Sequence, residues 1–567
     1  MPTPPLLASV ELPLRRYSRR TALDQDVLNT ISDYLDPSLR RTLSYAAVCG
    51  DRNLMERFAY RQPFGQLDPY FRQWIYTKSM AQAALNGDLE YVKWLTEQFP
   101  GCFVTAAVEE AARNGHLAIL QWLHACHGDV KWGTDEIGCA LRNNHTDVAH
   151  WLYENVPELA PHDMKAAAAE SGNLELLKWA SVCWPSVWPS DSAVVNGAMK
   201  TGSLEVVKWV VENQLFQRHT FGVISLRRAA EYGQLDVIKW MVEIHAGRCM
   251  PEDLEAAANN GHFNVVKWIV ENRPKSWITQ PVDRVCSHAN LEIVRWLSEN
   301  LPNCFSDRAM EFAAMRGHLD IVGYLHENRG EGCTVVAMDS AASGGHLEVV
   351  KFLHENRTEG CTTSAMDGAA ENGHLDVVQW LHAHRDEGCT VWAMTSAAGN
   401  GHLHVVEWLY DNRTEGRIPY SMDIAASNGH LEMLKWLHSH QNFKNADGPS
   451  SNTLDEAIGH GHFEVFRWLL ETQSIGCTGK AFEIAARNGQ FEAMLILRNE
   501  FGLKPRSYAL QNAMMNKELE MVQWLMNHFP DQAEGRTIKR PFFWPGVHIQ
   551  SWLQENGHAS MPRTAFS

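Results

Sequence analysis

The chain has 567 residues, 45% of them hydrophobic, and a formal net charge of −17. A negative surface repels phosphate backbones and attracts basic proteins, so we expect a protein partner of basic character and no nucleic acid. No run of about 18 apolar residues is present to span a membrane, and residues 1–20 lack the apolar core of a secretory signal. We therefore expect no membrane partner and a cytoplasmic location, or a nuclear one if the arginines of residues 15–20 direct the chain there.

Residues 22–49 are predicted to form amphipathic helices. Within them DVL (26–28), YLDP (34–37) and VC (48–49) resemble an F-box, the helical module that docks substrate receptors onto cullin-type ubiquitin ligases. The usual Leu-Pro opening of that module is not in place. The other interpretation is a helix pair that caps the repeats that follow. Residues 1–45 are thus expected to form an N-terminal arm with capping or F-box-like helices.

Residues 46–530 repeat one pattern at a nearly fixed interval. GHLEVVKFLH (345–354), GHLDVVQWLH (373–382) and GHLHVVEWLY (401–410) follow one another at steps of 28 residues, and a few other steps are 29 to 32. We call the first residue of this motif the marker. Self-similarity of this kind indicates a repeat architecture, in which a repeat buries its apolar surface only against its neighbours. The sixteen markers are Gly87, Gly115, Asn144, Gly172, Gly202, Gly233, Gly261, Ala289, Gly317, Gly345, Gly373, Gly401, Gly429, Gly461, Gly489 and Lys517.

Each repeat is predicted to contain two helices that meet at the marker. In one repeat, residues 365–372 form the first helix, and Gly373 then adopts the left-handed conformation that ends helices. Asn144 tolerates this conformation, whereas Ala289 and Lys517 suit it less well, so looser corners are expected there. The second helix starts just after the corner and is apolar over most of its circumference. A helix of that kind is covered on more than one side.

An aromatic residue recurs seven positions after the marker, as Trp380, Trp408 and Trp436 illustrate. One interpretation is an aromatic ladder that binds a ligand. The other is packing between neighbouring repeats, which we favour because every repeat needs it equally.

The motif AAxNGHLxVVxWL resembles the second half of an ankyrin repeat, and the match covers residues 46–529. The resemblance implies paired helices stacked into a solenoid that binds other proteins. Two departures are evident: the repeat has 28 residues instead of 33, and the Thr-Pro-Leu-His opening of the first helix is missing. The missing residues come from the connection that forms the ankyrin β-hairpin. Binding by hairpin tips is therefore not expected here.

Acidic residues recur six positions before the marker. If the repeats stack as in ankyrin arrays, these residues line up along the first helices on the concave side. One interpretation is an acidic stripe that recognises a basic partner. The other is that an acid there stabilises the positive end of a helix dipole or bonds a neighbouring loop. The candidate partner-binding residues of the most regular repeats are Glu311, Asp339, Asp367, Thr395 and Asp423.

Cysteine and histidine follow the repeat. Cys333, Cys361 and Cys389 occupy equivalent positions, and stacked helical layers lie about 8–10 Å apart. A disulfide needs Cα atoms closer than about 7 Å, so we expect reduced thiols. Histidines directly follow many markers, as His346 and His374 do, and are part of the repeat motif rather than a metal cluster. The sequence shows no zinc-finger spacing, no P-loop and no G-x-S-x-G or H-E-x-x-H motif, so we expect no enzyme, no metal and no cofactor.

The whole pattern predicts an all-α, ankyrin-like solenoid of about sixteen two-helix repeats. Residues 46–530 form the array, and residues 531–567 form a C-terminal cap and tail. We expect a monomeric, non-catalytic scaffold that presents an elongated surface to a protein partner. The alternative is a substrate-recognition subunit of a cullin-type ubiquitin ligase, recruited through residues 22–49.

Overall fold

The structure is a computed structural model of the whole chain. It describes residues 43–61, 64–100, 102, 104, 107–126, 130, 132, 135–156, 164–184, 191–213, 226–244, 249–272, 281–288, 290–301, 303–415, 421–440, 451–472, 476–506, 508–530, 549, 552 and 553. Most of the F-box-like segment and of the predicted C-terminal cap lies outside these residues. The division into residues 1–45, 46–530 and 531–567 and the F-box interpretation stay predictions.

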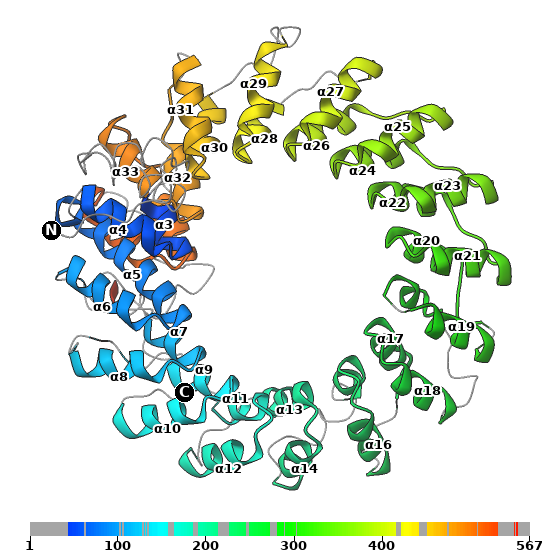
Figure 1. Cartoon of the computed structure of the whole chain (residues 1–567), viewed down its shortest axis with the longest axis horizontal. Helices are drawn as coiled ribbons and strands as arrows, with labels where there is room; N and C mark the ends of the chain where they lie inside the picture. The colour runs from blue at the N-terminus through cyan, green and yellow to red at the C-terminus, as the bar shows by residue number, and fades with distance from the viewer. Residues whose placement is uncertain are drawn as a thin grey trace, which may run out of the picture. The chain divides into compact units, whose positions relative to one another are not determined.

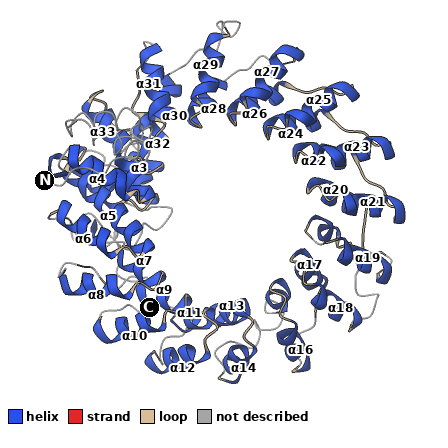
Figure 2. Ribbon diagram, in the orientation of Figure 1, coloured by secondary structure: helices blue, strands red, loops and turns tan. Residues whose placement is uncertain are grey.

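Every regular element in the described part of the chain is helical, which confirms the predicted all-α class (Figure 2). Short helices follow one another in pairs along the sequence (Figure 1). The chain divides into two compact units, and the first of them combines both ends of the chain. Unit 1 comprises residues 1–160 and 454–567, and unit 2 comprises residues 161–453.

Unit 1 holds the first and the last repeats. Its first part contains α3 (Leu43–Cys49), α4 (Arg52–Arg61), η2 (Phe64–Gln66), α5 (Pro69–Asn86), α6 (Leu89–Gln98), α7 (Ala107–Arg113), α8 (Leu117–Cys126), α9 (Glu136–Arg142) and α10 (Thr146–Asn155). The second part contains α30 (Ser451–Gly459), which starts at the boundary, α31 (Phe463–Thr472), α32 (Lys480–Arg487), α33 (Phe491–Asn499), α34 (Ala509–Met515) and α35 (Leu519–His528).

Unit 2 holds the middle repeats. Its helices are α11 (Met164–Glu170), α12 (Leu174–Cys183), α13 (Asp191–Thr201), α14 (Leu204–Glu212), residues 226–231, α16 (Leu235–Glu243), α17 (Pro251–Asn259), α18 (Phe263–Glu271), η4 (Asp283–Ser287), α19 (Leu291–Asn300), α20 (Arg308–Met315), α21 (Leu319–Asn328), α22 (Val335–Ser343), α23 (Leu347–Asn356), α24 (Thr363–Glu371), α25 (Leu375–His384), α26 (Val391–Gly399), α27 (Leu403–Asn412), α28 (Ser421–Ser427) and α29 (Leu431–Ser439).

The corner between the two helices of a repeat has the predicted left-handed backbone. Gly345, Gly373 and Gly401 have φ values of 76°, 81° and 81°. Asn144 and Lys517 both have φ of 61°, so Lys517 makes the same corner as the glycines. The expectation of a looser corner at Lys517 is therefore wrong, because the helices on either side impose the conformation on this residue. Ala289 lies outside the described residues.

The core lies between the two helices of each repeat and between neighbouring repeats. On α25, Val377, Val378 and Leu381 are buried, and on α24 the small Ala369 and Ala370 are fully buried. Burying a valine or leucine side chain stabilises a fold by about 1.5–3 kcal/mol, and each repeat contributes several such residues. The alanines allow neighbouring first helices to approach closely. In the described ranges, no helix is both long and apolar enough to cross a bilayer.

Candidate binding surface on the first helices

The predicted acidic residues lie where one repeat meets the next. Asp339 accepts two hydrogen bonds from Thr362, at 2.8 Å from the backbone N and at 2.7 Å from Oγ1. Asp367 accepts the same pair from Thr390, at 2.8 and 2.6 Å. Each of these threonines is the N-cap residue of the next first helix. The carboxylates therefore fix the point at which the following helix begins.

The other candidate partner-binding residues also make contacts inside the array. Glu311 accepts a hydrogen bond from the Thr334 hydroxyl, and Asp423 accepts one from the Thr453 hydroxyl. Thr395, which replaces the acid in its repeat, is buried and donates 2.8 Å to a backbone oxygen of its own helix. The structure thus places four of the five residues at repeat junctions. Their contact with a partner stays a prediction.

The capped helices present apolar side chains from their first turn. The Trp392 backbone N donates to Thr390 Oγ1, and the Val336 backbone N donates to Thr334 Oγ1, both at 3.2 Å. Trp392 is 65% exposed and Val336 is 46% exposed. The sequence analysis did not single out these residues. One signal was present, since Trp392 does not lie seven residues after a marker as the other tryptophans of the regular repeats do.

Two further apolar residues are exposed on first helices of unit 2, one on α26 and one on α28. Val391 precedes Trp392, and Ile424 lies on α28, the next first helix after α26. A Cβ on Gly399 would lie 2.7 Å from Cγ2 of Ile424, so Ile424 reaches over α26, the helix that carries Trp392. Val336, Val391, Trp392 and Ile424 are thus the exposed large apolar residues of the first helices α22, α26 and α28.

Histidines after the marker join neighbouring repeats at their corners. Nε2 of His116 donates to the backbone oxygen of Leu85 at 3.1 Å, and Nε2 of His262 donates to that of Glu231 at 3.0 Å. Burial lowers the pKa of His402, which also bonds a backbone oxygen of the preceding repeat. These rings serve stacking of the repeats. In the part of the chain that the structure describes, no three His, Cys, Asp or Glu side chains form a group that could hold a metal ion.

The aromatic residues seven positions after the marker also pack between repeats. The Trp380 ring meets the His354 ring edge-to-face at 5.2 Å, and the Trp408 ring meets the His382 ring in the same way at 5.1 Å. Each histidine comes from the repeat before. Aromatic pairs in this arrangement contribute about 0.5–1.5 kcal/mol beyond their buried area. The favoured interpretation of the tryptophans as packing between repeats is confirmed.

The connection between repeats carries an arginine, a glutamate and a cysteine. Arg385, just after α25, pairs with Glu387 and lies beside the thiol of Cys361 from the preceding repeat. Burial raises the pKa of Cys361 to about 11, the Glu387 charge adds to this, and Arg385 opposes it. The thiol is therefore protonated at neutral pH and is a poor nucleophile. All twelve cysteines are free, as predicted.

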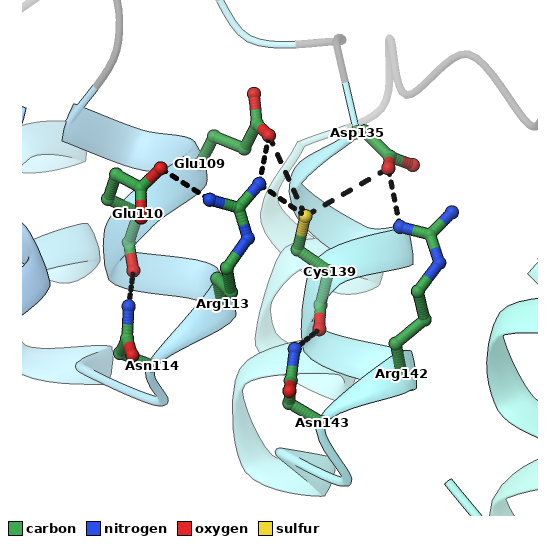
Figure 3. Close-up of polar contacts among 8 residues, drawn as sticks. All are labelled: Glu109, Glu110, Arg113, Asn114, Asp135, Cys139, Arg142 and Asn143. Atoms are coloured by element: carbon green, nitrogen blue, oxygen red, sulfur yellow. Dashed lines mark hydrogen bonds and ion pairs between the residues drawn. The ribbon is translucent and has the colours of Figure 1, made fainter. Parts of the chain in front are cut away.

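A less regular polar cluster joins α7 and α9 in unit 1 (Figure 3). Arg113 pairs with Glu109 and Glu110, and its Nη2 also lies 3.5 Å from Sγ of Cys139. Asp135 Oδ2 lies 3.9 Å from the same sulfur. Burial raises the pKa of Cys139 to about 11, the carboxylates add to this, and Arg113 opposes it. The cluster therefore holds a protonated thiol among paired charges and offers no activated nucleophile.

Family models for ankyrin repeats match the regular part of the array. A model described as ankyrin repeats in many copies matches residues 310–354, 338–382 and 366–410. A model described as ankyrin repeats in three copies matches residues 394–481. No curated protein matches the chain.

Solved structures similar to this chain include a pentatricopeptide repeat protein, PPR10. Its complex with an 18-nt psaJ RNA element aligns at 11% identity over 97% of this chain and 96% of that chain, with a TM-score of 0.32. The structure of PPR10 from maize aligns at 10% identity over 98% and 94% of the two chains, with a TM-score of 0.28. The prediction that nucleic acid is excluded is contradicted by this comparison, because one of the two PPR10 structures contains RNA, and net charge alone does not support it. Residues 310–481 are thus similar to ankyrin repeats, as the repeated motif predicted.

Proposed function

We propose that this chain is a non-catalytic scaffold that binds another protein through the first helices of unit 2, with Trp392 as the central contact. The exposure of Trp392 carries the proposal. A tryptophan that is 65% exposed leaves a large apolar area in water. Tryptophan is also the residue type most enriched among the energetic centres of protein interfaces.

The support for Trp392 is rigid. Asp367 holds Thr390, and Thr390 caps the helix whose second residue is Trp392. The indole itself has neither a hydrogen bond nor a ring contact within the described residues. The backbone is therefore fixed while the ring is available. A surface that is ordered before binding loses less conformational entropy on association, which favours affinity.

The predicted acidic residues gain a role in this arrangement. Asp367 and Glu311 position the helix starts from which Trp392 and Val336 project. The second part of the proposal is that these carboxylates contact the partner directly. A carboxylate oxygen that already accepts one hydrogen bond can accept another. The free thiols suit a reducing compartment, so we propose that the scaffold acts in the cytoplasm or the nucleus.

The test compares the proteins captured by the full chain and by its Trp392→Ser variant, each from lysate with and without nuclease treatment. Tyr508→Ser is a matched control, because Tyr508 occupies the same repeat position in unit 1 and is 60% exposed. We expect the partner to be retained by the control and lost by Trp392→Ser. The affinity of the recovered partner, measured by calorimetry, should fall at least about 30-fold, the effect of removing a central interface residue.

Equal capture by Trp392→Ser and by the unaltered chain would refute the proposal. An association that disappears after nuclease treatment would instead identify a nucleic acid as the ligand. Ligase subunits among the captured proteins, lost when residues 1–45 are deleted, would favour the ubiquitin-ligase alternative.

A further inference from the structure

Helix α5 is unusually long for a first helix of this array. It has 18 residues, whereas α7 has 7 and α24 has 9. It ends at the corner residue Gly87, as the other first helices end at theirs, so the additional turns lie at its start. Asp68 caps this extension by accepting hydrogen bonds from the backbone N of Tyr70 and of Phe71, at 3.0 and 3.2 Å. The extension is therefore a well-formed helix that the repeat itself does not need.

The extension packs against the C-terminal repeats within unit 1. The Phe71 ring meets the Phe491 ring edge-to-face at 5.5 Å, and the Trp74 ring meets it at 6.2 Å. All three side chains are buried. The ring of Tyr70 also lies 6.4 Å from that of His528 at the end of α35. These aromatic residues form an apolar contact between segments that are more than 400 residues apart in the sequence.

Polar contacts define the register of this junction. Trp74 Nε1 donates to Glu518 Oε2, and Lys78 Nζ pairs with Glu518 Oε1, both at 2.8 Å. Thr77 Oγ1 donates to Glu520 Oε1 at 2.8 Å. Both acids lie at the start of α35, and Glu518 is its N-cap residue. A helix start favours negative charge, so the same residues serve α35 and the junction.

The acids of this junction are buried and paired across it. Glu520 is 5% exposed, and burial raises the pKa of its carboxyl. Glu518 has 12% of its side chain exposed and is neutralised by Lys78 across the junction. A buried carboxylate that loses its partners destabilises a structure strongly, so a wrong surface would be rejected at this place.

We infer that the α5–α35 junction is a heterologous interface that a second copy of this chain can occupy in place of the chain's own end. The surface of α5 differs from the surface of α35 that it contacts. The contact includes no chain segment that connects these two helices directly. In an interface of that kind, α5 can bind α35 of its own chain or α35 of another copy, as in domain swapping. Repeat proteins are prone to such exchange.

An exchange of charge tests the inference in the full-length chain. Lys78→Glu in one chain and Glu518→Lys in another each place like charges at the chain's own junction. In a mixture of the two, both junctions between unlike chains bring opposite charges together. We expect each variant alone to sediment as one chain and the mixture to form a species of twice that mass. The double variant Lys78→Glu/Glu518→Lys restores the pair within one chain and should sediment as one chain.

A mixture that sediments as the sum of its separate components would overturn the inference. Circular dichroism of each variant establishes that the helices remain. If either variant loses them, wild-type chains with two different tags are refolded together at low and high concentration. Capture of one tag with the other that increases with concentration supports the inference, and its absence at every concentration refutes it.

Discussion

The substitution Gly373→Ala separates two demands on the corner residue. Gly373 has φ of 81°, a conformation that costs an L-residue about 1–2 kcal/mol. The added Cβ would also lie 2.6 Å from Nδ1 of His402. The ring must then move away from the backbone oxygen of Glu371 that it bonds. A lost hydrogen bond costs about 1 kcal/mol and overpacking about 1–3 kcal/mol. We therefore expect Gly373→Ala to destabilise α24–α27 by about 3–6 kcal/mol.

Gly261→Ala is the control for backbone strain. Gly261 has φ of 76°, but no atom of the described residues lies within 4 Å of its added Cβ. Its cost should stay at about 1–2 kcal/mol. Long repeat arrays depart from two-state unfolding, so amide hydrogen exchange in the helices around each corner is the suitable measurement. Equal losses of protection in the two variants would show that the histidine contact contributes nothing. Adding His402→Ala to Gly373→Ala should recover part of the loss.

Three further outcomes are expected. Asp367→Ala removes two hydrogen bonds to the next helix and should destabilise α24–α26 by about 1–3 kcal/mol, measured by amide hydrogen exchange. The control Asp376→Ala, on the exposed side of α25, should change hydrogen exchange little. Equal effects of the two substitutions would refute the capping role of Asp367. Burial lowers the pKa of His402 below 6.5, so this residue binds more protons in the unfolded chain than in the folded one. The stability that it contributes is therefore complete above pH 6.5 and falls as the pH decreases below that value. His402→Ala should remove this part of the pH dependence of urea denaturation. Burial raises the pKa of the Cys389 thiol to about 11. Alkylation of this thiol at pH 8 should therefore be about 100-fold slower than alkylation of the exposed Cys126. Equal rates would contradict the burial of the Cys389 thiol.

Much of the fold could be predicted because the repeat makes its contacts at fixed intervals. The corner at Gly373, the buried Val377 and Leu381, and the packing role of Trp380 all follow from positions that recur. The left-handed backbone at Lys517 could not be predicted from residue preference, because packing of the flanking helices overrides it.

The surface was harder to predict than the core. The sequence placed Asp339 and Asp367 at one repeat position but could not show that each bonds a threonine 23 residues later, since that distance depends on how repeats stack. The sequence analysis did not single out Trp392, because the exposure of a side chain does not follow the repeat. The junction of Trp74 with Glu518 joins residues 444 positions apart, and no repeating spacing connects them.

The contacts between repeats also constrain how such an array can grow. Asp367 bonds a residue 23 positions ahead, whereas His116 bonds one 31 positions behind. A repeat that carries both the acid and the histidine thus supplies one half of a bond to each neighbour, and repeats of this kind and the same length can stand beside one another. Gene duplication of a whole repeat preserves every bond, while a deletion inside a helix breaks several at once. The bond from Asp423 to Thr453 spans 30 residues instead of 23, so extra length is accepted in the connection before a first helix. Variation in length should therefore accumulate in these connections across related genes.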